Sequence, residues 1–241
     1  MTGAARGIGR SIALALADAG ADVALGLRDS STAVDIEEAV VRMGRRCTRL
    51  AMDVRDLGQI STAVEQAIAE LGRLDILVNN AGLGPANNAE NVTEAVYDLT
   101  FDVNVKGTFF ASQAAGRAMI RQRFGRIINL SSQAGLVALP TESVYCTTKA
   151  AIAHLTKCLA VEWGSYGITV NAVAPTFIRT PGTEGDLTDA EFHRDVVERI
   201  AALHRIGEPM DVAGAVVFLA SPAADLITGT TLLIDVGWTA R

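Results

Sequence analysis

The chain has few of the residues that stabilise small proteins without a large core. It contains three cysteines and three histidines in 241 residues, and aromatic residues make up 5% of it. The cysteines have no C-x-x-C spacing and we expect no secretory signal ahead of them, so the expected compartment is a reducing cytoplasm with neither a disulfide framework nor a metal site. A chain of this length can bury a large core within one domain, and small aliphatic residues must fill it.

The sequence also lacks a basic excess and any long apolar run. Lys and Arg number 21 against 27 Asp and Glu, which gives a formal net charge of −6. Nucleic-acid binders need a basic surface that neutralises phosphates, so nucleic acid is not an expected partner. Charged residues, Gly or Pro interrupt every apolar run before the length of about 18 residues that a membrane-spanning helix needs. We therefore expect no membrane association.

Short apolar runs alternate along the chain with longer segments of helical period. The expected strands cover residues 22–27, 47–52, 76–79, 126–130, 169–173 and 231–235, and the expected helices cover 10–17, 31–43, 60–71, 93–121, 145–166 and 210–219. Strands separated by helix-length segments predict one doubly wound (Rossmann) α/β domain over residues 1–241, with a mostly parallel sheet and helices on both faces. Such sheets bind ligands beyond the carboxyl ends of their strands.

Two segments at expected strand ends are suited to a nucleotide. Thr2-Gly3-Ala4-Ala5-Arg6-Gly7-Ile8-Gly9 runs into residues of helical spacing. Glycines let the backbone approach a pyrophosphate at a helix N-terminus, where free N–H groups and the helix dipole favour anions. The same pattern also fits a tight turn without a ligand. The segment Asn79-Asn80-Ala81-Gly82 ends an aliphatic run with amides that can tie loops together and small residues beside which a flat adenosine can pack.

A tyrosine, a lysine and a serine have the spacing of an acid–base site. Residues four apart share a helix face, so the Lys149 ammonium can lie beside the Tyr145 phenol. A nearby positive charge favours the phenolate, and we expect it to lower the pKa of Tyr145 toward neutral pH. Ser132 lies 13 residues upstream at a strand end, where its hydroxyl could hydrogen-bond a substrate oxygen.

Together these segments resemble the short-chain dehydrogenase/reductase family, in its bacterial branch of 3-oxoacyl-carrier-protein reductases and sugar and polyol dehydrogenases. The resemblance covers essentially the whole chain and rests on the glycine segment, Asp53-Val54, Asn79 to Gly82, Asn104, Ser132, Tyr145 with Lys149, Asn171, and Pro175 to Thr180. It implies a seven-stranded sheet and an oxidoreductase that transfers a hydride between NAD(P)(H) and a secondary alcohol or ketone.

The resemblance also implies a role for each site residue. The catalytic set would be Asn104, Ser132, Tyr145 and Lys149. Tyr145 would exchange a proton with the substrate oxygen, which Ser132 would polarise. Lys149 would hold the ribose of the nicotinamide nucleotide, and Asn104 would support a water relay to it. The cofactor-binding residues would be Gly3, Arg6, Gly7, Ile8, Gly9, Arg28, Asp53, Val54, Asn80, Ala81, Gly82, Tyr145, Lys149, Pro175, Ile178 and Thr180.

Cofactor choice depends on the end of the second strand of the family fold. The NAD-selecting carboxylate of the family would align with Leu27, which is not an acid. Arg28 follows it, and Arg6 precedes the second glycine of the loop, so two guanidiniums could flank a 2′-phosphate. NADP(H) is therefore favoured over NAD(H). The alternative is that a one-residue shift lets Asp29 reach a 2′-hydroxyl and leaves Arg28 as a solvated loop charge.

Two positions depart from the family pattern. Pro175-Thr176 stands where Pro-Gly is usual, and Asp235-Val236-Gly237 stands where Asp-Gly-Gly is usual. If glycine supplies a positive φ there, Val236 is expected to strain the turn.

The expected substrate lid covers residues 177–205, which begin with a polar, Gly-flanked stretch. With Thr141, Glu142 and Ser143 just before Tyr145, this polarity favours a polyol, sugar or other small hydroxylated carbonyl compound, although all of these could be ordinary loop residues. One alternative is a 3-oxoacyl group on an acidic carrier protein, for which the candidate basic docking residues are Arg117, Arg121, Arg123 and Arg126. A catalytically idle dinucleotide-binding protein is a further alternative, which the intact catalytic set disfavours.

Two expectations concern assembly and the start of the chain. The helices expected over 93–121 and 145–166 carry apolar residues on more than one face, and the resemblance likewise implies a homotetramer or homodimer built on them. The strand that the family places ahead of Thr2 is missing from this sequence. Because that strand is central and buried, we expect about ten more apolar residues upstream.

Overall fold

The computed structural model describes residues 1–199 and 202–240 and shows an α/β architecture in which every strand pairing is parallel. The strands are β1 (Val23–Leu27), β2 (Cys47–Ala51), β3 (Ile76–Asn79), β4 (Gly125–Leu130), β5 (Ile168–Pro175) and β6 (Thr231–Ile234). β1 pairs with β2, and the other four form a sheet in the order β3-β4-β5-β6. The predicted doubly wound fold is confirmed, with six of the seven family strands present in the described residues.

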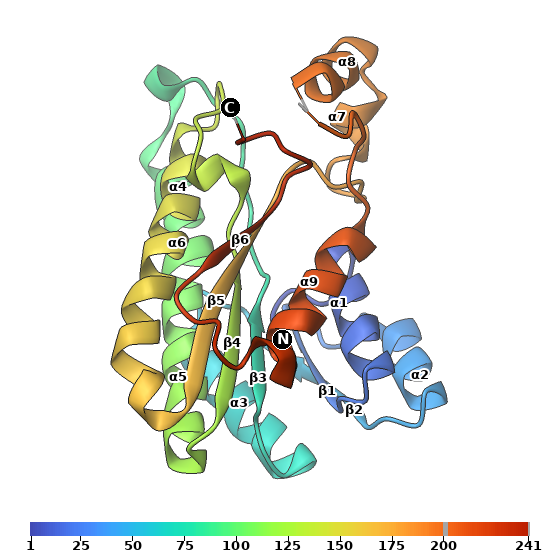
Figure 1. The fold of residues 1–241 in the computed structure, drawn as a ribbon, viewed down its shortest axis with the longest axis vertical. Helices are drawn as coiled ribbons and strands as arrows, with labels where there is room; N and C mark the ends of the chain where they lie inside the picture. The colour runs from blue at the N-terminus through green and yellow to red at the C-terminus, as the bar shows by residue number, and fades with distance from the viewer. Residues whose placement is uncertain (200–201, 241) are drawn as a thin grey trace.

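Helices cover both faces of the sheet (Figure 1). They are α1 (Gly7–Asp18), α2 (Val34–Arg42), α3 (Leu57–Leu71), α4 (Glu94–Phe101), α5 (Gly107–Gln122), α6 (Ser143–Trp163), α7 (Glu184–Thr188), α8 (Ala190–Arg199) and α9 (Pro209–Ala220), with short turns η1 (Ala89–Asn91), η2 (Asp102–Lys106), η3 (Gln133–Gly135), η4 (Gly164–Tyr166) and η5 (Pro222–Ala224). None of the described helices is long and apolar enough to cross a membrane. Within the same residues, no group of three His, Cys, Asp or Glu is placed to hold a metal ion.

The expected helix over 93–121 is two α-helices joined by a π-helical turn. The side chain of Thr93 caps α4 by accepting the N–H of Val96, and η2 then connects α4 to α5. A π turn inside a helix often marks a functional site, because the extra residue redirects side chains and backbone groups. Asn104 lies in the middle of this turn and is fully buried.

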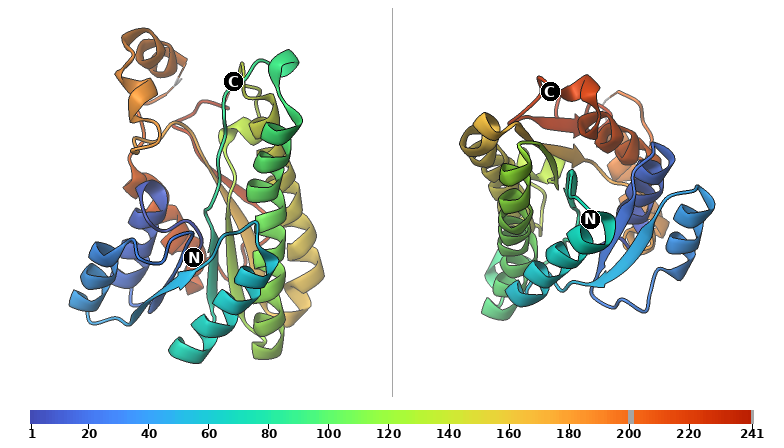
Figure 2. Two further views of the ribbon diagram at one scale, coloured as in Figure 1. Left: turned by 180° about the vertical axis from the view of Figure 1, so that it is seen from behind. Right: turned by 90° about the horizontal axis from the view of Figure 1, so that it is seen from below.

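Small aliphatic side chains fill the space between the layers, as the composition predicts. One core cluster lies where α3, α5 and α6 meet the sheet and includes Ala111, Ala115 and Ile127, all with no exposed area. A second lies between the sheet and the pair α1 and α9. Figure 2 shows the two helical layers on either side of the strands. Because β3, β4 and β5 are parallel neighbours, their carboxyl ends lie at the same edge of the sheet, between the two helical layers.

The first residues of the chain join the two sheets. Thr2 N–H donates to Val78 O at 3.0 Å, while Gly3 N–H donates to Gly26 O at 3.0 Å and Gly26 N–H donates to Met1 O at 2.8 Å. Met1 to Gly3 therefore lie between β1 and β3, where the strand preceding the glycine segment was expected. In the residues that the structure describes, no other segment pairs with those two facing edges.

The segment between β5 and α9 stands apart from the sheet at its carboxyl end (Figure 1). It carries α7 and α8 and has its own apolar cluster of Leu187, Val196 and Ile206. Phe177, Phe192 and Trp238 pack around this cluster. The segment coincides with the predicted lid over 177–205, of which residues 200–201 lie outside the described residues.

Candidate active site

The glycine segment forms a turn that leads directly into α1. Gly3 and Gly7 have φ values of +65° and +55°, which other residues rarely adopt. A side chain at Gly9 would collide with the backbone of Gly3. The helix begins at Gly7, and the residue before it, Arg6, makes no side-chain cap. The N–H groups of the first turn therefore face the loop without a side-chain acceptor.

Thr2 and Asn80 lock the glycine turn to the end of β3. The Oγ1 atom of Thr2 accepts the N–H groups of Asn80 and Ala81, both at 3.0 Å. In return, Asn80 Nδ2 donates to the carbonyl oxygens of Thr2 at 3.2 Å and Gly3 at 2.8 Å. The predicted cofactor residues of these two loops thus share one hydrogen-bond network. The role of Thr2 was not predicted, because the sequence gives no sign that its partner lies 78 residues away.

Asn104 ties three elements together beside the predicted catalytic lysine. Its Oδ1 accepts the N–H of Leu83 at 2.9 Å, and its Nδ2 donates to Leu83 O at 2.8 Å and to Thr148 Oγ1 at 3.0 Å. A side chain at Gly82 would come within 3.5 Å of both Asn104 Oδ1 and Lys149 Nζ. Asn104 and Lys149 therefore lie on either side of one small space. Thr148 was missed as a site residue, since its contact with Asn104 spans 44 residues.

Lys149 is a buried cation at the end of β4. Its Nζ donates to the carbonyl oxygen of Leu130 at 2.7 Å and lies 5.4 Å from the centre of the Tyr145 ring. Only 5% of the residue is exposed. Removal of the ammonium from water lowers the pKa of Lys149 to about 8.

Tyr145 and Ser132 meet as predicted, but the pKa of the tyrosine shifts in the opposite direction. The Tyr145 hydroxyl lies close enough to the Ser132 side chain for the serine to lower its pKa, but burial outweighs this effect and raises the pKa of Tyr145 to about 12. The expectation that Lys149 would lower this pKa is wrong for this arrangement. Desolvation of the phenolate outweighs the effect of Ser132, and the nearby carboxylate of Glu142 raises the pKa further.

Ser132 is held in place from both sides. Its Oγ accepts the N–H of Ala134 at 3.1 Å and donates to Pro175 O at 3.4 Å. The first bond closes the turn η3 on the serine hydroxyl, and the second joins the ends of β4 and β5. The hydroxyl groups predicted to be catalytic therefore lie beyond the carboxyl ends of the central strands, where a doubly wound sheet binds ligands.

The residues expected to select the cofactor lie around the end of β1. Arg6 and Arg28 are exposed, and neither guanidinium makes a hydrogen bond or ion pair within the described residues. The charge of Arg28 lies close enough to Asp53 to help lower the pKa of that carboxyl. Asp29, which in the alternative would bind the ribose 2′-hydroxyl of NAD(H), accepts hydrogen bonds from the Ser31 N–H at 2.9 Å and from the Ser31 hydroxyl at 2.6 Å. One of its two carboxylate oxygens, Oδ1, is therefore already engaged within its own turn.

Two of the predicted cofactor-binding residues, Asp53 and Val54, follow β2. The carboxylate of Asp53 pairs with Arg55 at 2.6 Å, and this pair lowers the pKa of Asp53. Val54 is buried against Gly107 at the start of α5, where a side chain on the glycine would meet it. Both residues lie on the same edge of the sheet as the glycine turn, because β1 and β2 are parallel neighbours.

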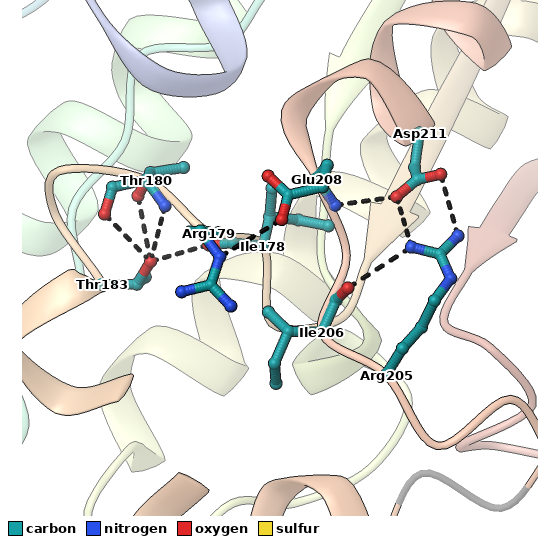
Figure 3. A network of polar contacts seen from close by, with 8 residues as sticks. All are labelled: Ile178, Arg179, Thr180, Thr183, Arg205, Ile206, Glu208 and Asp211. Carbon is teal, nitrogen blue, oxygen red and sulfur yellow. Dashed lines mark hydrogen bonds and ion pairs between the residues drawn. The ribbon is translucent and has the colours of Figure 1, made fainter. Parts of the chain in front are cut away.

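Two segments connect the predicted lid to the rest of the fold, and we call them the two limbs of the hinge: residues 175–183 from the end of β5 and residues 205–211 at the start of α9. The predicted cofactor-binding residues Pro175, Ile178 and Thr180 lie in the first limb, and Figure 3 shows the polar contacts of both limbs. Thr183 Oγ1 donates to Ile178 O at 2.6 Å and accepts the N–H of Thr180 at 3.0 Å. The side chain of Thr180 lies against Gly7, so the hinge touches the glycine turn. Thr180 is thus brought beside the glycine turn, and the cofactor contacts expected of Pro175, Ile178 and Thr180 stay a prediction.

The two limbs of the hinge are joined to each other and to α9. Arg179 N–H donates to Gly207 O at 2.8 Å, and Gly207 N–H donates to Phe177 O at 3.0 Å. Two ion pairs reinforce this bridge (Figure 3): Arg179 with Glu208 at 3.2 Å, and Arg205 with Asp211 at 2.8 Å.

A cavity of about 460 Å³ lies under this hinge, between the carboxyl ends of β5 and β6. Its walls include Thr176, Ile178, Gly207, Leu233 and Asp235.

The two departures from the family pattern have different outcomes. Val236 has a φ of +50°, so the strain expected at this position is confirmed. Its side chain packs against the apolar cluster of the lid. Thr176 has one of the few buried side-chain oxygens in the described chain that lack a hydrogen-bond partner.

Two of the arginines suggested as a docking patch do not lie near the site. Arg126 is buried at the amino end of β4 and pairs with Asp225, and Arg123 stacks over Tyr166 at the same end of the sheet. Strands rise about 3.3 Å per residue, so Arg126 and Ser132 are separated by roughly 20 Å along β4. This placement removes the basis for a carrier-protein surface at Arg123 and Arg126; for Arg117 and Arg121, both on α5, the docking role stays a prediction.

Three comparisons with known proteins agree on the family. A family model described as enoyl-(acyl carrier protein) reductase matches residues 3–239. The chain is 38% identical to 2-dehydro-3-deoxy-D-gluconate 5-dehydrogenase of Dickeya dadantii over 100% of its own length and 94% of the relative. It is 41% identical to a 3-oxoacyl-(acyl-carrier-protein) reductase of Staphylococcus aureus, covering 98% and 96%.

The solved structures extend this likeness to the whole fold. The gluconate 5-dehydrogenase of Burkholderia cenocepacia, solved in complex with NADP and tartrate, matches with a TM-score of 0.95 and 34% identity, over 100% of this chain and 94% of that one. The chain thus belongs to the short-chain dehydrogenase/reductase family and is an oxidoreductase that acts on CH–OH groups.

Proposed function

We propose that this enzyme uses NADP(H) to interconvert a small polyhydroxylated ketone and its alcohol, with Asn104, Ser132, Tyr145 and Lys149 as its catalytic machinery. The observation that carries the proposal is the grouping of Tyr145, Ser132 and the buried Lys149 ammonium beyond β4, with Lys149 Nζ 5.4 Å from the Tyr145 ring centre and bonded to Leu130 O. Two hydroxyl donors directed at one point can hold a carbonyl oxygen and protonate it.

The residues around the glycine turn fit a dinucleotide. The first turn of α1 offers N–H groups without a side-chain cap, and bare glycines leave the backbone open to a pyrophosphate. The guanidiniums of Arg6 and Arg28, which make no hydrogen bond or ion pair in the described residues, suit a 2′-phosphate, whereas one oxygen of the Asp29 carboxylate is already bonded to Ser31. Asp53, Val54, Asn80, Ala81 and Gly82 would hold the adenosine and ribose, and Pro175, Ile178 and Thr180 the nicotinamide end. When bound, the nicotinamide supplies or takes up the hydride.

The protein's own part in the reaction is proton transfer and positioning. A pKa of about 12 keeps Tyr145 protonated at neutral pH, so its hydroxyl is ready to donate to a substrate oxygen during reduction. Ser132 holds that oxygen with its own hydroxyl. Lys149, whose pKa is lowered to about 8, keeps a mobile proton near the tyrosine and would hold the ribose. Asn104 fixes the geometry on this side through its bond to Thr148.

Relatives and site chemistry both favour a hydroxylated substrate. Two of the similar proteins bear the names of a deoxygluconate and a gluconate dehydrogenase. The alternative, reduction of a 3-oxoacyl group on a carrier protein, is the activity named for the Staphylococcus aureus relative. The position of Arg123 and Arg126 at the opposite end of the sheet disfavours this alternative.

The assembly and compartment are part of the proposal. Phe109 on α5 and Val161 on α6 are 38% and 85% exposed, and an apolar groove lined by Phe101, Phe110 and Leu155 lies between these helices. A homotetramer or homodimer would cover this surface. The three cysteines are all unpaired, which suits a cytoplasmic enzyme.

The test is NADPH oxidation with ketoses, keto sugar acids and an acetoacetyl thioester, comparing the wild type with Tyr145→Phe and with Tyr166→Phe as the control. Loss of a positioned general acid slows catalysis by about 10²- to 10⁴-fold, so Tyr145→Phe should lose activity while Tyr166→Phe keeps it. Equal rates in the wild type and Tyr145→Phe would contradict the mechanism. No turnover of any ketone despite NADPH binding would favour an idle binding protein.

A further inference from the structure

Two buried polar atoms without partners flank the site. They are Oε1 of Gln133 and Oγ1 of Thr176, and neither has a hydrogen-bond partner in the structure. Gln133 is 2% exposed and Thr176 is 9% exposed, so water does not compensate them. Neither residue has been given a function above.

The two residues occupy equivalent places on neighbouring strands. β4 and β5 are parallel, and their pairing continues through the bond from Ser131 N–H to Val173 O at 2.9 Å. One step further, Ser132 Oγ contacts Pro175 O. Gln133 is the residue after Ser132, and Thr176 is the residue after Pro175. Both therefore stand one position beyond the serine that would hold the reacting oxygen.

Thr176 also lies at the wall of the space under the lid, with its hydroxyl oxygen buried. It lines the cavity of about 460 Å³ together with the hinge residues Ile178 and Gly207. Its N–H is bonded to Ile234 O at 3.1 Å, which leaves the side-chain hydroxyl as its free polar group.

Buried polar atoms of this kind destabilise the fold unless a ligand supplies the missing hydrogen-bond partner. A buried polar group without a partner destabilises a fold, and native proteins leave few of them. An apolar residue at position 133 or glycine at position 176 would avoid the penalty. Two such atoms on either side of one catalytic hydroxyl therefore point to a partner supplied by the substrate.

The chemistry of the two atoms limits what that partner is. The amide oxygen of Gln133 only accepts hydrogen bonds, so it requires a donor. A substrate hydroxyl donates, whereas a ketone, thioester or ionised carboxylate does not. The Thr176 hydroxyl can both donate and accept, so it can serve the same group from the other side.

We propose that Gln133 and Thr176 are specificity-determining residues that bind a hydroxyl group on the carbon next to the reacting carbonyl. This inference rests on the proposed function and deepens it, because it assigns the enzyme to α-hydroxy ketones and vicinal diols. The carbon between the two carbonyls of a 3-oxoacyl thioester carries no hydroxyl, so such a substrate would leave both atoms unpaired.

The test uses a matched pair of ketones that differ by one hydroxyl, 3-hydroxy-2-butanone and 2-butanone. Sites that hydrogen-bond a substrate hydroxyl discriminate strongly against analogues without it. We expect Gln133→Leu and Thr176→Val each to lower kcat/KM for the hydroxyketone by about 10- to 100-fold, with less than about a twofold change for 2-butanone. Most of the loss should be in KM, because both residues bind substrate and transfer no proton.

A stability measurement separates this role from a structural one. Removing an unpartnered buried polar atom should raise the melting temperature of both variants, by about 2–4 °C for a gain near 1 kcal/mol. Thr231→Val is the matched control, because Thr231 Oγ1 is also buried without a partner but lies at the amino end of β6. It should raise the melting temperature without changing the ratio of the two kcat/KM values.

The outcomes distinguish the two proposals. Variants that keep the wild-type ratio, or that lose activity equally on both ketones, contradict the roles of Gln133 and Thr176 and leave the oxidoreductase intact. A wild-type enzyme that reduces neither ketone nor any substrate of the broader panel contradicts the proposed function and this inference with it.

Discussion

The ammonium of Lys149 bonds to the carbonyl oxygen of Leu130 at 2.7 Å and lies 5.4 Å from the ring centre of Tyr145. The two groups are neighbours without being directly bonded through the phenol oxygen. Burial therefore acts on each separately, raising the pKa of Tyr145 to about 12 and lowering that of Lys149 to about 8.

The buried lysine predicts a pH dependence of stability. The folded pKa of Lys149 is about 8, below the ordinary value of 10.5. Between these values the unfolded chain binds a proton that the folded chain does not, so the free energy of unfolding rises with pH; below pH 8 the full penalty is present. Relative to Lys149→Met, the wild type should gain about 2–3 kcal/mol of stability from pH 7.5 to pH 10. Urea unfolding of both proteins at the two pH values measures this.

The control for this prediction is Lys157→Met, which removes an exposed lysine from the same helix. Its stability difference from the wild type should be the same at both pH values. A Lys149→Met difference that also stays constant would show that the ammonium is not desolvated in the folded protein.

The proposed preference for NADP(H) over NAD(H) predicts how replacing Arg28 changes the binding of each cofactor. Arg28 is exposed and makes no hydrogen bond or ion pair among the described residues, so its loss costs the fold little. A charge-assisted bond to a phosphate is worth about 1.5–3 kcal/mol, so Arg28→Ser should weaken NADPH binding by about 10- to 100-fold and leave NADH binding nearly unchanged. Fluorescence titration of both cofactors measures the two constants.

Arg42→Ser is the matched control, because Arg42 is an exposed arginine on α2 that pairs with Glu38. It should leave both affinities unchanged. Tighter binding of NADH than NADPH by the wild type would instead favour the alternative in which Asp29 holds the ribose.

Much of the fold was predictable because its signals are local. The strand and helix boundaries follow the apolar periodicity closely: residues 76–79 match β3, and residues 210–219 lie within α9. The site residues Tyr145 and Lys149 were found for a similar reason, since i and i+4 share a helix face. What the sequence could not show is where long-range partners lie, as with Asn104 and Thr148. The direction of the Tyr145 pKa was missed because spacing reports neighbouring charges but not burial.

At position 236 we expect glycine to give a more stable protein than alanine, which reverses the usual order of stability for these two residues. Its φ of +50° lies in the left-handed region, which costs a residue with a Cβ about 1–2 kcal/mol. Val236→Ala keeps this strain and loses packing against the lid cluster, whereas Val236→Gly loses the same packing and the strain. The glycine variant should therefore be more stable than the alanine variant by about 1–2 kcal/mol.

Thermal or urea unfolding of the two variants measures this difference. Val161, 85% exposed on α6, provides the comparison, because in a helix interior glycine is about 1 kcal/mol less stable than alanine. The opposite order at position 236 would show that the left-handed conformation is not present in solution.

Among the charged residues of the hinge, we expect Asp211 to contribute most to holding the lid segment in place. Asp211 accepts the N–H of Glu208 at 2.7 Å as part of the cap of α9, and it also pairs with both terminal nitrogens of Arg205. Most surface ion pairs contribute little, but loss of a helix cap costs about 1 kcal/mol. Asp211→Ala should therefore loosen the second limb of the hinge and speed tryptic cleavage within residues 177–205, with a smaller effect on global unfolding.

Glu38→Gln is the control, since it removes an exposed ion pair from α2 without touching a cap. Its cleavage rate should equal that of the wild type. NADPH should slow cleavage in the wild type, because Thr180 on the first limb lies against Gly7 of the glycine turn. If both limbs of the hinge are needed to hold the lid on the cofactor, NADPH should protect Asp211→Ala from tryptic cleavage less well than it protects the wild type. Equal protection of the two proteins would show that the first limb alone positions the lid.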